Sequence, residues 1–242
     1  MGQTIVLVSS KGGSGKSTVA VGLSAALSVS GKRILLIDID EGARCLDTML
    51  SINADTVFDI ADVLLGNVDY KDASLSVSAL PNVAVIPSPY ENKPLDFKKL
   101  AEFTQSVSDE FDYIILDTKG QLPADRLSQL KSAAKFVAVV TDNSVALKNT
   151  GVLCRGLAEK GIECRLIINR YKPRGQNKKI NNIDEMINTC QASLLGIVPE
   201  DKIMSVYAGR PIVFGSAAKA IHRIAARLEG QAVPLPKIKD IK

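Results

Sequence analysis

The chain has 242 residues, of which 46% are hydrophobic and 23% are charged. That length suits one large α/β domain, and the hydrophobic content excludes a disordered chain. The net charge of +4 is too small to indicate a nucleic-acid partner by itself.

Short β-branched runs alternate with longer amphipathic stretches along the chain. Strands are predicted where apolar residues are continuous, at 4–9, 33–38, 83–87, 113–117, 136–141, 165–169 and 194–198. Helices are predicted at 17–29, 56–65, 96–110, 124–135, 147–160, 183–190 and 216–229. Residues 74–81 and 171–182 are predicted as long loops. The alternation predicts an α/β fold, with a single doubly wound, mostly parallel sheet and helices on both faces. We expect one domain over residues 1–230, followed by a short tail at 231–242.

Two further patterns bear on the compartment. No apolar run approaches the roughly 18 residues of a membrane-spanning helix, and the N-terminus carries no secretory pattern. The four cysteines form no Cys-x-x-Cys pair, so the usual signature of a zinc or iron–sulfur site is missing. We therefore expect a cytoplasmic protein with reduced thiols.

A glycine-rich loop between the first predicted strand and helix is the strongest motif, and it reads Val8-Ser-Ser-Lys-Gly-Gly-Ser-Gly-Lys-Ser-Thr18. Its glycines allow consecutive backbone N–H groups to turn toward phosphate oxygens, and the next helix points its positive end at the same anion. Lys16 would reach the β and γ phosphates, and the Ser17 hydroxyl would bind Mg²⁺. The predicted ATP contacts in this loop are Lys11, Gly12, Gly13, Ser14, Gly15, Lys16, Ser17 and Thr18.

Two features of this loop depart from the general phosphate-loop pattern G-x-x-x-x-G-K-[ST]. Ser10 stands where the first glycine belongs, and Lys11 adds a second lysine five residues before Lys16. Within one subunit, Lys11 cannot easily reach the phosphate that Lys16 reaches.

Two aspartates end predicted buried strands at the edge where an open parallel sheet binds its ligand. A carboxylate at Asp38 or Asp117 is costly to bury unless Mg²⁺ or Lys16 pairs with it, so we predict both as Mg²⁺ ligands together with Ser17. The alternative interpretation is that both residues cap the helices that follow.

Several motifs occur in the order typical of one family. They are the loop with Lys11, the segment Asp38-Ile-Asp40-Glu-Gly-Ala-Arg44-Cys-Leu-Asp47, the strand ending at Asp117, Ile167-Ile-Asn169-Arg170, and Leu195-Gly-Ile-Val-Pro199-Glu-Asp201. Together they resemble the MinD/ParA family of deviant Walker A P-loop ATPases over nearly the whole chain, and the MinD branch more than the ParA branch.

The resemblance implies a mechanism and a set of roles. Lys11 would reach across an ATP-dependent, face-to-face homodimer to the partner's phosphates, and Asp40 would position the attacking water. With Lys16, these two residues are the predicted catalytic groups. The predicted contacts at the adenine end are Asn169, Arg170, Pro199 and Asp201. The implied role is spatial regulation of cell division, with ATP and Mg²⁺ as cofactors and a stimulating protein as partner.

The chain departs from the family at three places. The family usually reads Asp-x-Pro-(Ala/Pro)-Gly after its second aspartate, whereas Asp117 leads into Thr-Lys-Gly-Gln121. After Thr141, Asp-Asn-Ser144 replaces the frequent Pro-Glu, so a glutamate at the dimer contact is expected to be missing. Pro234 and Pro236 interrupt the tail where MinD proteins carry a membrane-binding helix. We therefore expect weak or no membrane anchoring, with transient binding at the inner membrane face as the alternative.

Three other interpretations stay open at this point. A DNA-partition ATPase could use the basic window Arg170, Lys172, Arg174, Lys178 and Lys179, although we favour a solvated loop beside the adenine site as the explanation of this window. A nucleotide-gated binding protein with little hydrolysis fits the altered segment after Asp117. A flagellar-number regulator related to MinD has no supporting N-terminal extension. The single histidine, His222, is expected at the boundary of the last helix rather than in catalysis.

Overall fold

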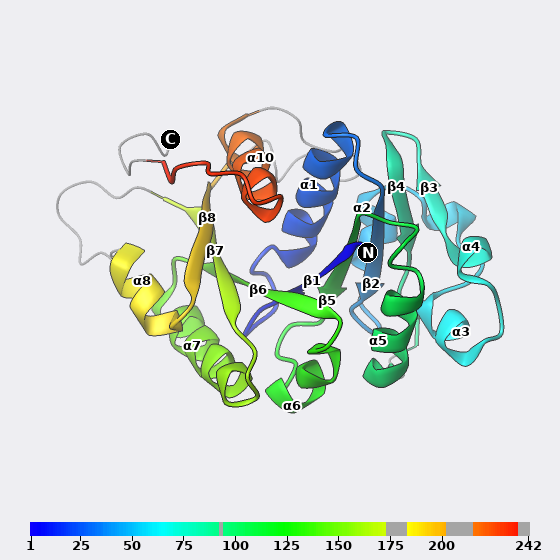
Figure 1. The fold of residues 1–242 in the computed structure, drawn as a ribbon, viewed down its shortest axis with the longest axis horizontal. Helices are drawn as coiled ribbons and strands as arrows, with labels where there is room; N and C mark the ends of the chain where they lie inside the picture. Colours follow the sequence, from blue (N-terminus) through cyan, green and yellow to red (C-terminus); the bar gives the residue numbers. More distant parts are fainter. Residues whose placement is uncertain (92–93, 173–182, 202–214, 237–242) are drawn as a thin grey trace.

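An eight-stranded sheet forms the centre of the computed structural model, which describes residues 1–91, 94–172, 183–201 and 215–236 (Figure 1). The strand order is β3-β4-β2-β5-β1-β6-β7-β8, and β3 pairs antiparallel with β4 whereas the other pairings are parallel. The strands are β1 Gln3–Val8, β2 Ile34–Ile39, β3 Leu75–Val77, β4 Leu80–Ile86, β5 Tyr113–Thr118, β6 Ala134–Thr141, β7 Cys164–Tyr171 and β8 Ser193–Pro199.

Helices cover both faces of this sheet, as the sequence predicts. The α-helices are α1 Lys16–Val29, α2 Cys45–Met49, α3 Ile60–Leu65, α4 Tyr70–Ala73, α5 Phe97–Ser106, α6 Ala124–Leu127, α7 Ser144–Glu159, α8 Ile183–Cys190 and α10 Gly215–Leu228, with short 3₁₀ turns η1 Asn53–Asp55 and η2 Ser128–Leu130. One apolar core contains residues of α1, α2 and α10, and the other contains residues of α3, α5, α6, α7 and α8. The two layers are visible above and below the sheet in Figure 1.

The central strands are buried along their whole length. Every residue of β2 and β5 is buried, and β1 is buried from Thr4 to Val8. This explains why their apolar residues are continuous rather than alternating. Because β2, β5 and β1 are neighbours and parallel, their carboxyl ends meet at one edge of the sheet, where the phosphate loop also begins.

Several predicted elements differ from the structure, and three of them are informative. The helix predicted at 124–135 ends as α6 and η2, because the chain from Ala134 pairs with β1 as the start of β6. The loop predicted at 74–81 contains β3, whose Val77 is buried opposite β4. The helix predicted at 56–65 begins only at Ile60, where the Asp59 carboxylate accepts the first amides of α3 in a capping box. No helix within the described part of the chain is long and apolar enough to cross a membrane.

Candidate nucleotide site

The phosphate loop connects β1 to α1 through a backbone that only glycine adopts readily. Gly13 and Gly15 have φ of 78° and 85°, and Gly15 is the N-cap of α1 without any side chain that caps the helix. The first amides of α1 are therefore left for a ligand rather than for a capping side chain. A helix start of this kind is a ready site for an anion such as a phosphate.

Lys16 lies buried beneath the loop. Its ammonium donates a hydrogen bond to the Ser9 hydroxyl over 3.0 Å, and Ser9 in turn donates to the Lys11 carbonyl over 2.8 Å. Ser9 thus holds both the loop backbone and the lysine, a role that sequence reasoning missed although Ser9 lies within the glycine-rich motif. The arrangement keeps a buried cation available at the place where phosphates would lie.

Two side-chain hydrogen bonds connect the loop to α7 and to β7. Ser10 donates to the Ala146 carbonyl in α7 over 3.1 Å. The buried Asn169 amide donates to the Ser14 carbonyl over 2.9 Å. Asn169, predicted at the adenine end, therefore lies against the loop with its amide nitrogen already engaged. Serine at position 10, where the general pattern has glycine, provides the contact with α7.

Asp38 and Asp117 face each other in the register of β2 and β5, and both are fully buried. Neither oxygen of Asp117 makes a hydrogen bond of ordinary geometry with the described residues. Burial and the neighbouring Asp38 raise the pKa of Asp117 to about 7, while the Ser17 hydroxyl and the Lys16 ammonium lower it. An orphaned, buried carboxylate beside a serine hydroxyl suits a divalent cation, because hard oxygen donors are what Mg²⁺ prefers.

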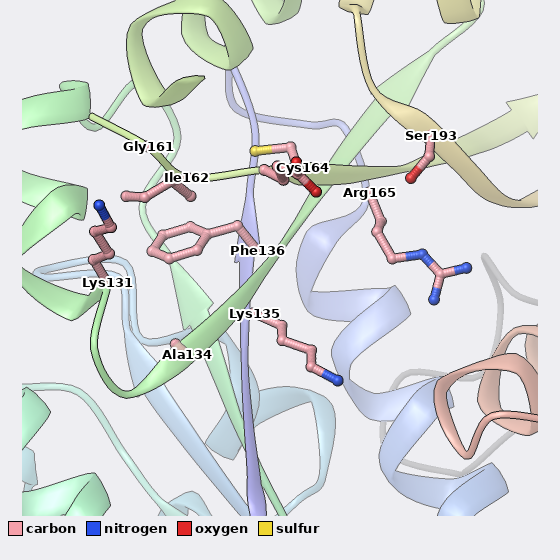
Figure 2. Close-up of a pocket in the computed structure, with 10 residues that line it drawn as sticks. Lys131, Ala134, Lys135, Phe136, Gly161, Ile162, Cys164, Arg165 and Ser193 are labelled. Atoms are coloured by element: carbon pink, nitrogen blue, oxygen red, sulfur yellow. The ribbon is translucent and has the colours of Figure 1, made fainter. Parts of the chain in front are cut away.

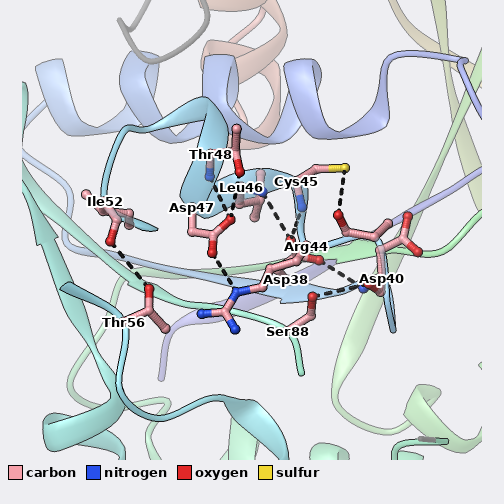
Figure 3. Close-up of polar contacts among 11 residues, drawn as sticks. Asp38, Asp40, Arg44, Cys45, Leu46, Asp47, Thr48, Ile52, Thr56 and Ser88 are labelled. Carbon is pink, nitrogen blue, oxygen red and sulfur yellow. Dashed lines mark hydrogen bonds and ion pairs between the residues drawn. The ribbon is translucent and has the colours of Figure 1, made fainter. Parts of the chain in front are cut away.

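Asp38 differs from Asp117 because backbone amides surround it. Its carboxylate accepts from Asp40 over 2.9 Å, from Cys45 over 3.0 Å and from Leu46 over 3.1 Å (Figure 3). The Cys45 and Leu46 amides are the first two of α2, so Asp38 binds this helix start from a distance, although the N-cap residue is Arg44 and not Asp38 as the alternative interpretation expects. Burial nevertheless raises the pKa of Asp38 to about 6, against the lowering effect of the three amides. Asp38 therefore adds negative charge beside Asp117 while it also fixes the loop after β2.

Asp40 lies two residues farther, half-buried, in the loop between β2 and α2. Burial raises its pKa, whereas the Lys16 and Lys119 ammonium groups act in the opposite direction. Its backbone carbonyl accepts from the Ser88 hydroxyl over 3.2 Å, which anchors the loop to the segment after β4. The Asp40 carboxylate is thus held near the lysine at the base of the phosphate loop.

The segment after Asp117 packs directly on the phosphate loop. A Cβ atom at Gly120 would lie 2.8 Å from the Gly12 nitrogen, so only glycine fits there. The Gln121 amide donates to the Ser9 carbonyl over 3.0 Å, and Gln121 has a φ of 67°, which is unusual for a residue other than glycine. Buried Thr118 donates to the Leu7 carbonyl over 2.7 Å. The altered segment is therefore an ordered part of the site.

A cavity of about 490 Å³ opens on the outer side of the loop and brings several predicted residues together. It is lined by Lys11, Gly12, Gly13, Thr141, Asp142, Asn143, Arg170, Lys172 and Glu200. Arg170 enters it from an irregularity in the pairing of β7 with β8 and has a φ of 54°. Asn143 caps α7 through its side chain, which is the structural role of the segment that replaces Pro-Glu.

Of the remaining predicted residues, Lys172 lines this cavity, whereas others lie away from it or outside the described chain. Pro199 ends β8, and the Asp201 carboxylate accepts from the Ala217 amide at the start of α10 over 3.4 Å. Lys172 forms an ion pair with Glu200. Arg174, Lys178 and Lys179 of the basic window are outside the described residues. His222 is half-buried on α10, as expected for a boundary residue.

A second cavity, of about 440 Å³, lies at the opposite edge of the sheet, between the amino ends of β6 and β7 (Figure 2). Lys131, Lys135 and Arg165 give it a basic lining, together with Phe136 and Glu163. It contains no residue that the sequence predicts to bind nucleotide. The carboxyl edge of the sheet is therefore the candidate site.

Comparison with known proteins agrees with this geometry. A family model described as an AAA domain matches residues 2–159. The septum site-determining protein MinD of Synechocystis sp. is 30% identical, with 97% of this chain and 92% of that protein aligned. The chain belongs to the MinD/ParA family of P-loop ATPases.

Solved structures of the MinD/ParA family have the same fold over nearly the whole chain. The MinC:MinD cell division protein complex of Aquifex aeolicus contains a chain that superposes with a TM-score of 0.85 at 28% identity, covering 97% of this chain and 99% of that one. MinD of Pyrococcus horikoshii OT3, solved as a complex with Mg-ADP, has a TM-score of 0.82 at 26% identity, covering 95% and 96%. The predicted fold class is confirmed.

Proposed function

We propose that this chain is a MinD-type ATPase that binds ATP with Mg²⁺, forms a face-to-face homodimer and hydrolyses the nucleotide slowly. The observation that carries this proposal is the buried Asp117 carboxylate, which makes no ordinary hydrogen bond within the described part of the chain and lies near the Lys16 ammonium and the Ser17 hydroxyl. The relative from Pyrococcus horikoshii, solved with Mg-ADP, supports the choice of ligand.

The phosphate loop would bind the triphosphate through its backbone amides and the uncapped start of α1. Lys16 would exchange its bond with Ser9 for phosphate oxygens, since both partners lie at the base of the loop. Ser17 and Asp117 would hold Mg²⁺, with Asp38 as the second carboxylate beside it. A bound Mg²⁺ ion neutralises phosphate charge and orients the phosphates for transfer.

Asp40 is the candidate residue for positioning the attacking water. Its carboxylate is half-buried, and the nearby Lys16 ammonium acts to lower its pKa, which supports a position close to the phosphates. Slow hydrolysis is consistent with positioning by a carboxylate and with charge stabilisation by lysines rather than with a strong general base.

Lys11 would complete the site of the second subunit in the dimer. Its side chain lines the cavity outside the loop, and its ammonium has no hydrogen bond or ion pair with the described residues. A cation held at the surface in this way is available to a phosphate that approaches from a partner. Arg170 and Asn169, with Pro199 and Asp201, are proposed at the adenine end.

The cellular role that we propose is spatial regulation of cell division, because the relatives with similar sequences include septum site-determining proteins. A stimulating protein partner is proposed by analogy with the MinC:MinD complex of Aquifex aeolicus. We also propose that residues 1–230 form the ATPase domain and that residues 231–242 are a tail with weak or no membrane anchoring.

A second candidate function is a nucleotide-gated binding protein with little hydrolysis. The observation that favours it is Lys119, which stands where the family usually has proline and acts to lower the pKa of Asp40. An extra cation near Asp40 would compete for the carboxylate that positions water. Phosphate release by Lys119→Pro, compared with the unaltered chain, separates the two candidates: a large increase favours the binding protein.

The proposal is tested by calorimetric titration with Mg·ADP and by phosphate release from Mg·ATP. Lys16→Ala should weaken Mg·ADP binding by about a hundredfold, because it removes the buried cation under the loop. Lys11→Ala should keep Mg·ADP binding and lose hydrolysis, because Lys11 acts on the partner's phosphates. Mg·ADP binding of ordinary strength by Lys16→Ala would contradict the proposed site.

A further inference from the structure

A partly buried ion pair links the loop after β2 to the helix after β5. Glu41 directly follows Asp40 in the chain and is only 5% exposed. Its carboxylate forms an ion pair with Arg126 of α6, whose side chain is 24% exposed. Glu41 also accepts a hydrogen bond from the Leu95 amide over 2.8 Å. A carboxylate of this kind is held from two sides, which fixes its position more firmly than a surface pair would.

Arg126 completes a three-way junction. Both of its terminal nitrogens donate to Glu41, and one of them also donates to the Leu95 carbonyl over 3.2 Å. Its guanidinium lies over the Phe97 ring at 4.5 Å from the ring centre. The Leu95 amide thus donates to Glu41, and the Leu95 carbonyl accepts from Arg126. The junction joins the loop after β2, the start of α5, and α6.

Both residues of this ion pair are close in sequence to residues of the candidate nucleotide site. On one side, Glu41 is the neighbour of Asp40, and the Gly42 amide donates to the Pro89 carbonyl over 3.3 Å. On the other side, Arg126 follows the segment in which Gly120 touches the phosphate loop and Gln121 donates to Ser9. A displacement of either loop must therefore move the shared pair or break it.

We propose that Glu41 and Arg126 are a positioning pair, which makes the Asp40 loop and the loop after Asp117 respond to bound nucleotide as one unit. This inference rests on the proposed function, because it assigns the pair to the same site. Neither residue touches the nucleotide; each acts through its loop, Glu41 on Asp40 and Arg126 on Gly120. When one partner is removed, the other is left as an uncompensated charge. The two loops then lose the ion pair that connects them.

The test uses a double-mutant cycle in the full chain: Glu41→Gln, Arg126→Met and the two together. Glu229→Gln is the control, because Glu229 pairs with Lys32 over 3.3 Å and belongs to neither loop. For each variant we would measure kcat and KM for Mg·ATP, Mg·ADP affinity and the thermal midpoint. Hydrogen–deuterium exchange of the nucleotide-free protein would follow residues 38–46 and 118–127.

A positioning role predicts that kcat falls about tenfold or more in all three variants, while KM and Mg·ADP affinity change by less than about twofold. The double variant should regain thermal stability, since no buried charge is left alone, but it should not regain kcat. Exchange should increase at 118–127 in Glu41→Gln and at 38–46 in Arg126→Met. The Glu229→Gln control should change neither kcat nor these exchange rates.

The inference is overturned if the variants keep the kcat of the unaltered chain, or if kcat returns together with stability in the double variant. It is equally overturned if increased exchange stays within the substituted loop. Should the unaltered chain neither bind Mg·ADP nor release phosphate, the proposed function fails instead. The exchange experiment needs no nucleotide, so it then decides alone whether the two loops are coupled.

Discussion

Two carboxylates, Asp38 and Asp117, lie side by side at the ends of buried strands, and burial, together with the charge of Asp38, makes Asp117 harder to ionise. Asp38 is compensated by three backbone amides, whereas Asp117 has the Lys16 and Ser17 side chains nearby but no ordinary hydrogen bond with the described residues. At the scale of the residue, these two neighbouring carboxylates are unfavourable when both are ionised in the interior. A bound cation would offset their negative charge.

This charge predicts how stability depends on pH in the absence of nucleotide. The folded pKa values of about 6 and about 7 lie above the ordinary value of 3.8, so the folded chain binds more protons than the unfolded chain in this range. The free energy of unfolding should therefore fall as pH rises from about 4 to about 7. Thermal midpoints at pH 5 and pH 8 measure the effect, and the midpoint should be higher at pH 5.

The matched variants are Asp117→Asn and Asp55→Asn. Asp117→Asn removes the group with the larger shift and should flatten the difference between the two pH values. Asp55 is exposed in η1 and away from the pair, so its substitution should leave the difference as it is. If the thermal midpoint falls equally between pH 5 and pH 8 in Asp117→Asn and in the unaltered chain, the Asp38–Asp117 pair is not the source of the pH dependence.

Residues of the site differ in how well the sequence predicts them. Asp38 and Asp117 were predictable, since a carboxylate at the end of a continuous apolar strand is costly to bury unless a cation pairs with it. The link between Glu41 and Arg126 was not predictable, because 85 residues separate them. Their pairing depends on how α6 and the loop after β2 pack around Leu95, which no local pattern records.

At the scale of the element, the loop between β5 and α6 shapes the phosphate loop by direct contact. Gly120 leaves no room for a Cβ atom beside the backbone of Lys11 and Gly12. The neighbouring Gln121 adopts a left-handed backbone at a position where the family pattern has glycine. Here the ordered contact with Ser9 maintains the turn despite the side chain.

We expect Gly120→Ala to weaken Mg·ADP binding by about tenfold or more, because the added methyl group must displace backbone that forms the anion site. Titration calorimetry measures the loss. Gln121→Gly is the control in the same loop, since it removes atoms and relieves the left-handed strain. It should keep the affinity and raise stability by about 0.5–1 kcal/mol. Unchanged binding in Gly120→Ala would contradict the contact.

Strands whose residues are all buried were predicted well, whereas the start of β6 and the short edge strand β3 were not. Strands such as β2 and β5 carry continuous apolar residues, which left little ambiguity. The helix predicted at 124–135 was wrong beyond Leu130, because pairing of Ala134 with Thr4 of β1 overrides the local helical pattern. The edge strand β3 has three residues, too few for a periodic signal.

At the scale of the whole molecule, the order of the strands in the sheet brings the residues of the site together. With β1 between β5 and β6, and β2 next to β5, the phosphate loop, Asp38 and Asp117 share one edge of the sheet. The sequence predicts alternating strands and helices but contains no direct record of this order. The motifs predict the shared edge indirectly, because a phosphate site needs all of them together.

The opposite side of the cavity beside the loop is formed by Arg170 and Glu200, from β7 and from the segment after β8. Lys11 lines this cavity, so a second subunit bound over this face would lie near its ammonium. The central claim is our proposal of a nucleotide-dependent homodimer in which Lys11 acts on the partner, which this arrangement and the resemblance to the family support.

The most direct measurement is the molar mass by light scattering behind size exclusion, in Mg·ADP and in Mg·ATP. Asp40→Ala serves as the parent, because it should stall hydrolysis and keep ATP bound. The account predicts a monomer in Mg·ADP and a dimer in Mg·ATP, with the dimer lost when Lys11→Ala is added. An unchanged mass in both nucleotides, in protein that demonstrably binds ATP, would contradict the dimer mechanism.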